Sequence, residues 1–316
     1  MGDVVHALPA ISDIARERPG AAIDWIVEAP FAAIPALHPA VATVFPMAWR
    51  KWRKRLFARE TWAAMGAFRR QLRQVRYDLV LDLQGLVKSA LWAAQARGPR
   101  AGYDRHSIWE PAASLLYQRV AAVPKDLHAI DRCRRLAAAH LGYALPASAP
   151  RFGLVAPATT AAPDAAYAVL IPGASRPEKL WPEDDWIALA RRLRGERLRV
   201  VVLWGSVAER ERAQRIAAAA GGELPAFLSV RDAAGLLGRA RLAVGLDTGF
   251  SHIAAALGVA TVGIYCDHEP AAAGITGDGF TASLGGIGQV PALADVQRAV
   301  DQALGASDAR HDTASR

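Results

Sequence analysis

Short apolar runs alternate with helical stretches along most of the chain, and this alternation limits the possible folds more than any other feature. Apolar runs separated by helical patterns are typical of βαβ units, which build parallel sheets. The runs that we interpret as strands cover residues 22–28, 41–45, 78–83, 166–171, 198–203, 242–246 and 260–265. The helical patterns cover residues 4–18, 31–37, 62–76, 86–97, 183–194, 208–220, 230–239 and 253–257, and two more end near residue 141. The sequence therefore predicts an α/β protein.

Residues 146–163 interrupt this alternation, because they are rich in Pro, Ala, Ser and Thr and contain only one charged residue, Arg151. Such a composition is typical of a linker, and 316 residues suffice for two domains. We predict Rossmann-like, doubly wound parallel-sheet domains over residues 1–150 and 164–305, followed by a flexible tail over 306–316. Ligands of open α/β sheets bind beyond the carboxyl ends of the strands, so we expect the two domains to face each other across a ligand-binding cleft.

The formal net charge of +8 favours anionic partners, whether nucleic acid, anionic lipid or phosphorylated sugar. The only two cysteines, Cys133 and Cys266, lack metal-ligand spacing, so neither a disulfide framework nor a zinc site is expected. No apolar run is long enough to cross a bilayer, and the first residues lack the order of a signal peptide. We therefore predict a soluble, cytoplasmic protein.

Asp247-Thr248-Gly249-Phe250-Ser251-His252 follows a predicted strand and opens a predicted helix. A strand that turns directly into a helix leaves backbone N–H groups and the positive end of the helix dipole directed at one point. This corner is a candidate phosphate site. The alternative is that Thr248 or Ser251 simply caps the helix.

The run from Trp49 to Phe57, Trp-Arg-Lys-Trp-Arg-Lys-Arg-Leu-Phe, interleaves basic and aromatic residues. Such a run can bind nucleic acid, an anionic membrane surface or a phosphorylated amphiphile, or it can be a solvated surface. Charge alone does not distinguish these partners.

The chain opens on Met1-Gly2-Asp3, which leads into a helical pattern with no strand before it. A doubly wound domain normally begins with a strand that lies centrally in its sheet. We therefore expect this strand to be encoded upstream of Met1, and we expect the chain as written to be less soluble and nearly inactive without it.

Five blocks of the chain carry a resemblance to a known family: Met1–Ala10, Asp82–Ser89, Lys179–Pro182, Trp204-Gly205 and Asp247–His252. In order and separation they resemble the signature blocks of the lipopolysaccharide heptosyltransferases, over roughly residues 1 to 300. The block Asp-x-Gln-Gly-Leu-Val-Lys-Ser and the basic run at residues 49–54 are more similar to the heptosyltransferase I group than to the heptosyltransferase II group.

The resemblance implies a GT-B fold and transfer of L-glycero-D-manno-heptose from ADP-heptose to the 5-hydroxyl of the first Kdo of Kdo2-lipid A, with inversion at the anomeric carbon. It also implies a peripheral location on the anionic inner face of the cytoplasmic membrane, and no nucleic acid as a partner. No metal or cofactor is expected, because Lys179 and the helix N-terminus at Asp247 can neutralise the departing diphosphate.

The same resemblance assigns the reacting groups. Asp3 matches the family's general base, although its other interpretation is a helix N-cap, and a helix N-terminus makes a carboxylate a weaker base. Lys179 matches the lysine that stabilises the leaving group, and its other interpretation is a solvated loop lysine. Further donor-binding matches are Ser175, Glu209 for the adenosine ribose, Asp247, Thr248, Gly249 and His252.

Arg50, Arg53 and Lys54 match the acceptor-binding positions of the family. The chain departs from the family pattern at Trp109, where members tend to carry an arginine, and at His268, where they tend to carry a threonine. These two departures affect one expected acceptor contact and one expected donor contact.

Three alternatives to this function remain open. The first is a heptosyltransferase II-like enzyme with a different lipopolysaccharide acceptor. The second is a nucleotide-sugar epimerase or a nicotinamide oxidoreductase, although no G-x-G-x-x-G with a downstream acid opens either domain. The third is a truncated, inactive GT-B protein that still binds nucleotide.

Overall fold

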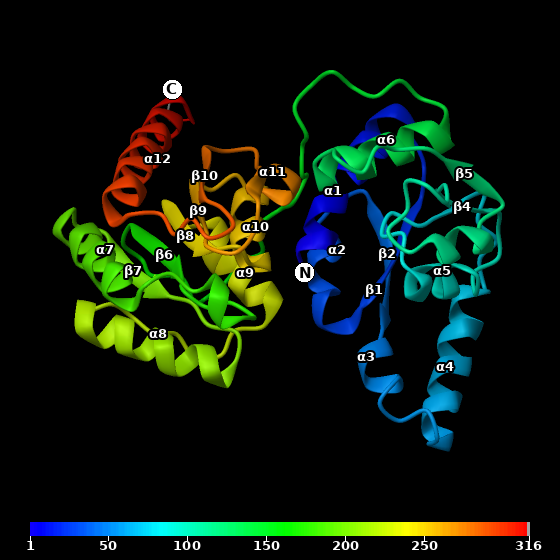
Figure 1. The fold of residues 1–316 in the computed structure, drawn as a ribbon, viewed down its shortest axis with the longest axis horizontal. Coiled ribbons are helices and arrows are strands. Elements are labelled where there is room, and N and C mark those ends of the chain that lie inside the picture. The colour runs from blue at the N-terminus through cyan, green and yellow to red at the C-terminus, as the bar shows by residue number, and fades with distance from the viewer. Residues whose placement is uncertain (315–316) are drawn as a thin grey trace. The chain divides into compact units, whose positions relative to one another are not determined.

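The structure is a computed structural model that describes residues 1–314 (Figure 1). It divides into two compact units, one formed by His6–Ala149 and the other by the chain from Pro150 onward together with Met1–Val5. The break between Ala149 and Pro150 falls inside the Pro-rich segment 146–163. Each unit is an α/β structure in which all strand pairs of the sheets are parallel.

The first unit contains two small sheets. Its elements, with the first turn of α1 belonging to the other unit, are α1 (Gly2–Glu17), β1 (Ile23–Glu28), η1 (Ala29–Phe31), α2 (Ala33–Ala36), β2 (Val41–Met47), α3 (Trp49–Trp52), α4 (Arg59–Leu72), β3 (Val80–Leu81), α5 (Val87–Ala93), β4 (Arg100–Tyr103), η2 (Pro111–Leu116), β5 (Arg119–Ala121) and α6 (Ala129–Leu141). The sheet orders are β1-β2 and β3-β4-β5.

Both sheets pack against the same helices. A buried cluster from α1 and α6 contacts Ile23 and Trp25 of β1 and also Leu81 of β3. Nevertheless, the edge of β1 opposite β2 and the edge of β3 opposite β4 have no strand partner among residues 1–314. Most of β1 and all of β3 are therefore only half-buried, unlike the central strands of the other unit.

The prediction of two further helices ending near residue 141 is half wrong. Only α6 forms there, and β4, η2 and β5 occupy the preceding region. At Gly102 in β4, an added Cβ would lie 2.3 Å from the Tyr117 ring, so the strand depends on a close approach by a residue fifteen positions away in sequence. A local helical pattern cannot reveal such a contact.

The second unit contains one five-stranded sheet in the order β10-β9-β8-β6-β7. Its elements are β6 (Tyr167–Ile171), η3 (Pro177–Lys179), α7 (Glu183–Gly195), β7 (Arg199–Val202), α8 (Val207–Ala220), α9 (Val230–Gly238), β8 (Leu242–Leu246), α10 (Gly249–Ala256), β9 (Thr261–Tyr265), α11 (Pro270–Ala273), β10 (Thr281–Gly285) and α12 (Leu293–Ala314). Strand β10 and helices α11 and α12 add to the elements that the sequence predicts.

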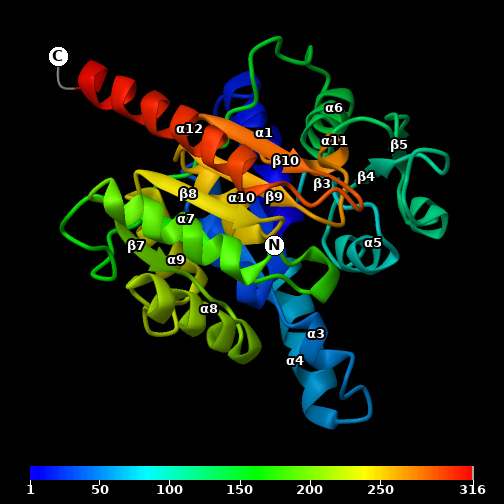
Figure 2. The ribbon, with the colours of Figure 1, turned by 60° about the vertical axis from the view of Figure 1, so that its left-hand side comes forward.

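Every residue of β6, β8 and β9 is buried. Helices α7, α8 and α12 form one core with these strands and β7, while α10 packs on β8 and β9 (Figure 2). Burial on both faces explains why these strands read as continuous apolar runs in the sequence. This is the doubly wound arrangement that the alternation predicts.

Residues 306–314 of the predicted flexible tail continue α12, and residues 315 and 316 lie outside the described part of the chain. Within residues 1–314, no helix has both the length and the apolar character needed to cross a membrane. The two cysteines, Cys133 and Cys266, are both buried and unbridged.

Candidate donor site and acceptor surface

The corner after β8 has the strand-to-helix form that the sequence predicts. β8 ends at Leu246 and α10 begins at Gly249, with Thr248 as the N-cap residue. The side chain of Thr248 makes no capping hydrogen bond, and the Ser251 hydroxyl donates to the Leu246 carbonyl at 2.6 Å. Neither Thr248 nor Ser251 therefore caps α10 with its side chain.

Three charged or titratable side chains meet at this corner. Lys179 Nζ lies 2.6 Å from Asp247 Oδ2, and His252 Nε2 lies 3.4 Å from Asp247 Oδ1. Burial by itself raises the pKa of the Asp247 carboxyl, but the hydrogen bonds from His252 and Lys179 and the charge of Lys179 outweigh burial and lower the pKa below its usual range. Asp247 is thus an ionised carboxylate that holds a cation at the end of the strand.

Lys179 reaches this corner because its loop is anchored by a buried tryptophan. The loop follows β6 and includes η3, whose last residue is Lys179. Two residues later, Trp181 is fully buried, donates from Nε1 to the Pro291 carbonyl at 2.8 Å and packs edge-on against Trp186 at 5.1 Å between ring centroids. In the Lys-Leu-Trp-Pro block, the buried tryptophan therefore fixes the position of the loop that contains Lys179.

Glu209 lies near the carboxyl ends of β6 and β7. Its Oε2 accepts from the Gly205 N–H at 2.8 Å, and an added Cβ at Gly173 would lie 2.7 Å from its Cδ. Ser206 caps α8 by accepting from the Glu209 N–H at 3.3 Å. Glycines on both sides thus let the carboxylate lie against two loops, which places Glu209 at the same edge of the sheet as Lys179 and Asp247.

Ser175 is exposed in the loop between β6 and η3. Sequence reasoning missed an ion pair beside it, in which Arg176 Nη2 lies 2.8 Å from Asp267 Oδ2. The pair connects the loop after β6 with the loop after β9. The sequence indicates only that Arg176 and Asp267 each lie in a loop that follows a strand, and it does not indicate that they pair. His268, the departure in the loop after β9, stacks on Tyr265 at 6.5 Å between ring centroids.

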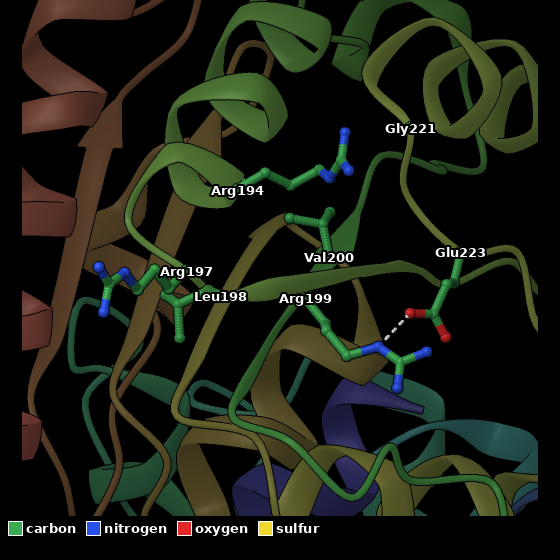
Figure 3. A pocket seen from close by; sticks show the side chains of 7 residues that line it. All are labelled: Arg194, Arg197, Leu198, Arg199, Val200, Gly221 and Glu223. Atoms are coloured by element: carbon green, nitrogen blue, oxygen red, sulfur yellow. Dashed lines mark hydrogen bonds and ion pairs between the residues drawn. The ribbon is translucent and has the colours of Figure 1, made fainter.

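A separate pocket of about 270 Å3 lies in the same unit, and three of its seven lining residues are arginines (Figure 3). Arg199, which begins β7, forms an ion pair with Glu223 at 2.6 Å, and Arg194 donates to the Ala220 carbonyl at 2.8 Å. This pocket lies at the amino end of β7, whereas the predicted donor residues follow the carboxyl ends of the strands. It is therefore distinct from the predicted phosphate corner.

Asp3 is exposed in the first turn of α1. That turn belongs to the same compact unit as the predicted donor residues. In this unit Met1 lies against the start of α10, where an added Cβ at Gly249 would be 2.4 Å from the Met1 Cβ. No side chain at position 249 is compatible with that approach, which gives this glycine a packing role beside its predicted donor role.

The predicted acceptor residues lie together in the other unit. Arg50 is in α3, and Arg53 and Lys54 follow directly, all three exposed. The Arg50 guanidinium lies over the Phe31 ring at 5.2 Å, and its backbone N–H donates to Glu28 Oε1 at 3.2 Å. The three cations therefore form one surface at the end of β2.

Two further features of this unit were missed by sequence reasoning. The first is Arg132, which is buried and lies 4.4 Å from the centroid of the Trp109 ring, so a cation lies beside this tryptophan. The second is Asp82, a buried carboxylate that accepts from the hydroxyls of Tyr117 at 2.6 Å and Ser89 at 2.7 Å. Asp82 thereby fixes the loop that contains the Asp82–Ser89 block.

The model of glycosyltransferase family 9 (heptosyltransferase) matches residues 65–299. The lipopolysaccharide heptosyltransferase 1 of Pseudomonas aeruginosa is 44% identical over 291 residues, which cover 90% of this chain and 79% of that protein. That of Escherichia coli K12 is 39% identical over 274 residues, covering 85% of this chain and 86% of the relative.

Among solved structures, E. coli heptosyltransferase WaaC with ADP superimposes with a TM-score of 0.88 at 36% identity, covering 96% of this chain and 97% of that one. The chain belongs to glycosyltransferase family 9. As a family 9 heptosyltransferase it is a glycosyltransferase of GT-B fold. The family match begins at residue 65, so it includes Lys179 and the Asp247 corner, and the full-length relatives extend the similarity over most of the chain.

Proposed function

We propose that this family 9 enzyme transfers L-glycero-D-manno-heptose from ADP-heptose to the first Kdo of Kdo2-lipid A. The observation that carries the proposal is the Lys179–Asp247–His252 cluster at the positive end of α10, with Glu209 at the same edge of the sheet. Similarity to WaaC solved with ADP-2-deoxy-2-fluoro heptose supports the donor. Similarity to lipopolysaccharide heptosyltransferase 1 from two organisms supports a lipopolysaccharide acceptor.

In this proposal the second unit binds the donor. Lys179 donates to the diphosphate as a point charge, and the backbone N–H groups of the N-cap residue Thr248 and of Gly249, the first residue of α10, donate to it as well. Asp247 and His252 position Lys179 and the start of the helix. Glu209 accepts from the ribose hydroxyls, while the Ser175 hydroxyl contacts a phosphate oxygen.

The chemical step is a single displacement. Asp3 takes the proton from the 5-hydroxyl of Kdo, the oxygen attacks the anomeric carbon of heptose, and the bond between that carbon and the diphosphate oxygen breaks. ADP leaves with the bonding electrons, and Lys179 and α10 stabilise its developing charge. Attack from the face opposite the leaving group inverts the anomeric carbon. No metal or cofactor is required in this scheme.

The acceptor carries carboxylates and phosphates at the surface of a membrane. Arg50, Arg53 and Lys54 form a cationic surface that matches those charges. We propose that the enzyme works as a peripheral protein at the anionic inner face of the cytoplasmic membrane, and that nucleic acid is not its partner.

Incubation of the purified chain with ADP-heptose and Kdo2-lipid A tests the proposal, with mass spectrometry of the lipid as the readout. We expect the addition of one heptosyl residue and release of ADP. A parallel reaction with an acceptor that already carries the first heptose separates the two activities. Transfer only to that second acceptor would assign the enzyme to the heptosyltransferase II type. ADP binding without any transfer would show that the chain is an inactive protein that binds nucleotide.

A further inference from the structure

The segment from α3 to the start of α4 consists of a buried base and an exposed tip. At the base, Trp52 is 8% exposed and packs against Phe68 and Trp92, with ring centroids 5.7 and 5.3 Å apart. Figures 1 and 2 both show α3 and the start of α4 extending beyond the ends of β1 and β2. The buried aromatic rings therefore hold the tip in a fixed direction.

The tip presents three large apolar side chains that are exposed to solvent. Phe57 is completely exposed, Trp62 is 60% exposed and Leu56 is 39% exposed. Trp62 Nε1 donates to the Leu56 carbonyl at 2.7 Å, so the polar edge of the indole is satisfied while its ring stays at the surface. Single exposed apolar residues are common, but three at the end of one projection mark an interaction surface.

The same tip is strongly cationic. Its exposed cations are Arg50, Lys51, Arg53, Lys54, Arg55 and Arg59. Residues 29–59 contain no aspartate or glutamate. Within the described chain, residues 1–314, none of these six cations forms an ion pair with a carboxylate. Glu60, in the first turn of α4, is the one carboxylate between residues 29 and 62, so the tip keeps a large excess of positive charge.

We infer that this tip is a membrane-insertion wedge for an anionic phospholipid bilayer. Leu56, Phe57 and Trp62 enter the boundary between head groups and acyl chains, and the surrounding cations contact lipid phosphates. An aliphatic side chain beside two aromatic ones suits hydrocarbon better than the stacked bases of a nucleic acid. This inference deepens the peripheral membrane association proposed above and rests on it for the identity of the membrane.

Vesicle co-sedimentation of the full chain, without lipopolysaccharide acceptor, tests the wedge. The probes are vesicles of phosphatidylcholine with or without phosphatidylglycerol. We expect the parent to bind only the anionic vesicles, and Phe57→Ser to bind them about tenfold more weakly or worse, because the ring no longer leaves water. The matched control is Leu115→Ser, since Leu115 is 86% exposed in η2 of the same unit, and it should bind like the parent.

Insertion can also be observed directly. Cys133 and Cys266 are buried, so an environment-sensitive dye can be attached selectively to a Phe57→Cys variant. A blue shift of its emission with anionic vesicles supports insertion. An unshifted emission, equal vesicle binding by Phe57→Ser and the parent, or stronger binding to duplex DNA than to anionic vesicles would each overturn the inference.

Transfer to a deacylated, water-soluble Kdo acceptor separates this inference from the proposed activity. Phe57→Ser should transfer heptose to that acceptor at the parent rate, because Phe57 acts on the membrane and not on the sugar. If the parent binds vesicles through Phe57 but transfers no heptose, the wedge stands and the proposed activity falls. If it transfers heptose but binds no anionic vesicle, the wedge and the peripheral membrane association fall, while the proposed heptose transfer stands.

Discussion

Replacement of Lys179 by methionine tests the donor site most directly, because methionine keeps much of the side-chain length and removes the charge together with its N–H donors. In the structure the lysine ammonium lies 2.6 Å from Asp247, and both side chains are 15% exposed. A hydrogen bond to a charged group contributes about 1.5–3 kcal/mol. Loss of such a bond to the diphosphate corresponds to a rise of about 10- to 150-fold in the Kd for ADP.

The same substitution also affects stability, because it leaves the carboxylate of Asp247 partly buried with only His252 beside it. An unpaired buried polar group costs about 1–3 kcal/mol. This corresponds to a fall of very roughly 5 °C in Tm for a domain of this size. The double variant Lys179→Met/Asp247→Asn removes both charges, so it should recover most of the lost stability without recovering ADP affinity.

Calorimetric titration measures the affinity for ADP, and thermal unfolding measures the stability. Both are carried out on the parent, Lys179→Met, the double variant and Lys125→Met, which is the control for loss of a lysine in general. ADP affinity equal to that of the parent in Lys179→Met would refute the phosphate contact. Recovery of ADP affinity together with stability in the double variant would also refute it. In that case the loss would come from the unpaired carboxylate rather than from a missing contact with the diphosphate.

Three other predictions concern separate parts of the site. Asp3→Asn should reduce heptose transfer by about a hundredfold or more while ADP affinity stays within twofold or so, and near-normal turnover would exclude the general base role. Alanine at Arg50, Arg53 or Lys54 should raise the apparent KM for the acceptor and weaken its dependence on salt, whereas a loss of ADP affinity in these variants would contradict the division of the substrates between the two units. The lowered pKa of Asp247 means that its stabilising contribution is complete above the ordinary carboxyl pKa of about 4 and is lost as the pH falls below it; thermal unfolding between neutral and acid pH should show a smaller decline for Asp247→Asn than for the parent, and identical slopes would count against the ionised carboxylate.

Much of the second unit follows from local sequence. β6, β8 and β9 are buried throughout. Such strands can be predicted from the sequence because they form apolar runs bounded by glycine and polar residues. The corner from Asp247 to Gly249 could also be predicted from the sequence, because a strand that meets a helix through small residues is a local pattern. By contrast, β10 at the sheet edge is only half-buried, so its sequence carries a much weaker pattern.

The site depends on contacts that no local pattern contains. Lys179 and Asp247 are 68 positions apart, and only the order of the parallel strands brings their loops to one edge of the sheet. Asp82 and Tyr117 likewise meet through tertiary packing across 35 positions. The sequence blocks include Lys179, Asp247 and Asp82 but not Tyr117, and only the structure shows which partner each of them contacts.

The basic and aromatic run shows the same division within one short segment. Its sequence determined that cations and large apolar side chains occur together between Trp49 and Phe57. Only the tertiary structure decided that Trp52 is buried against Phe68 while Phe57 is fully exposed. The physical reason is that side-chain chemistry is a property of each residue, whereas burial depends on which distant surface of the fold lies opposite it.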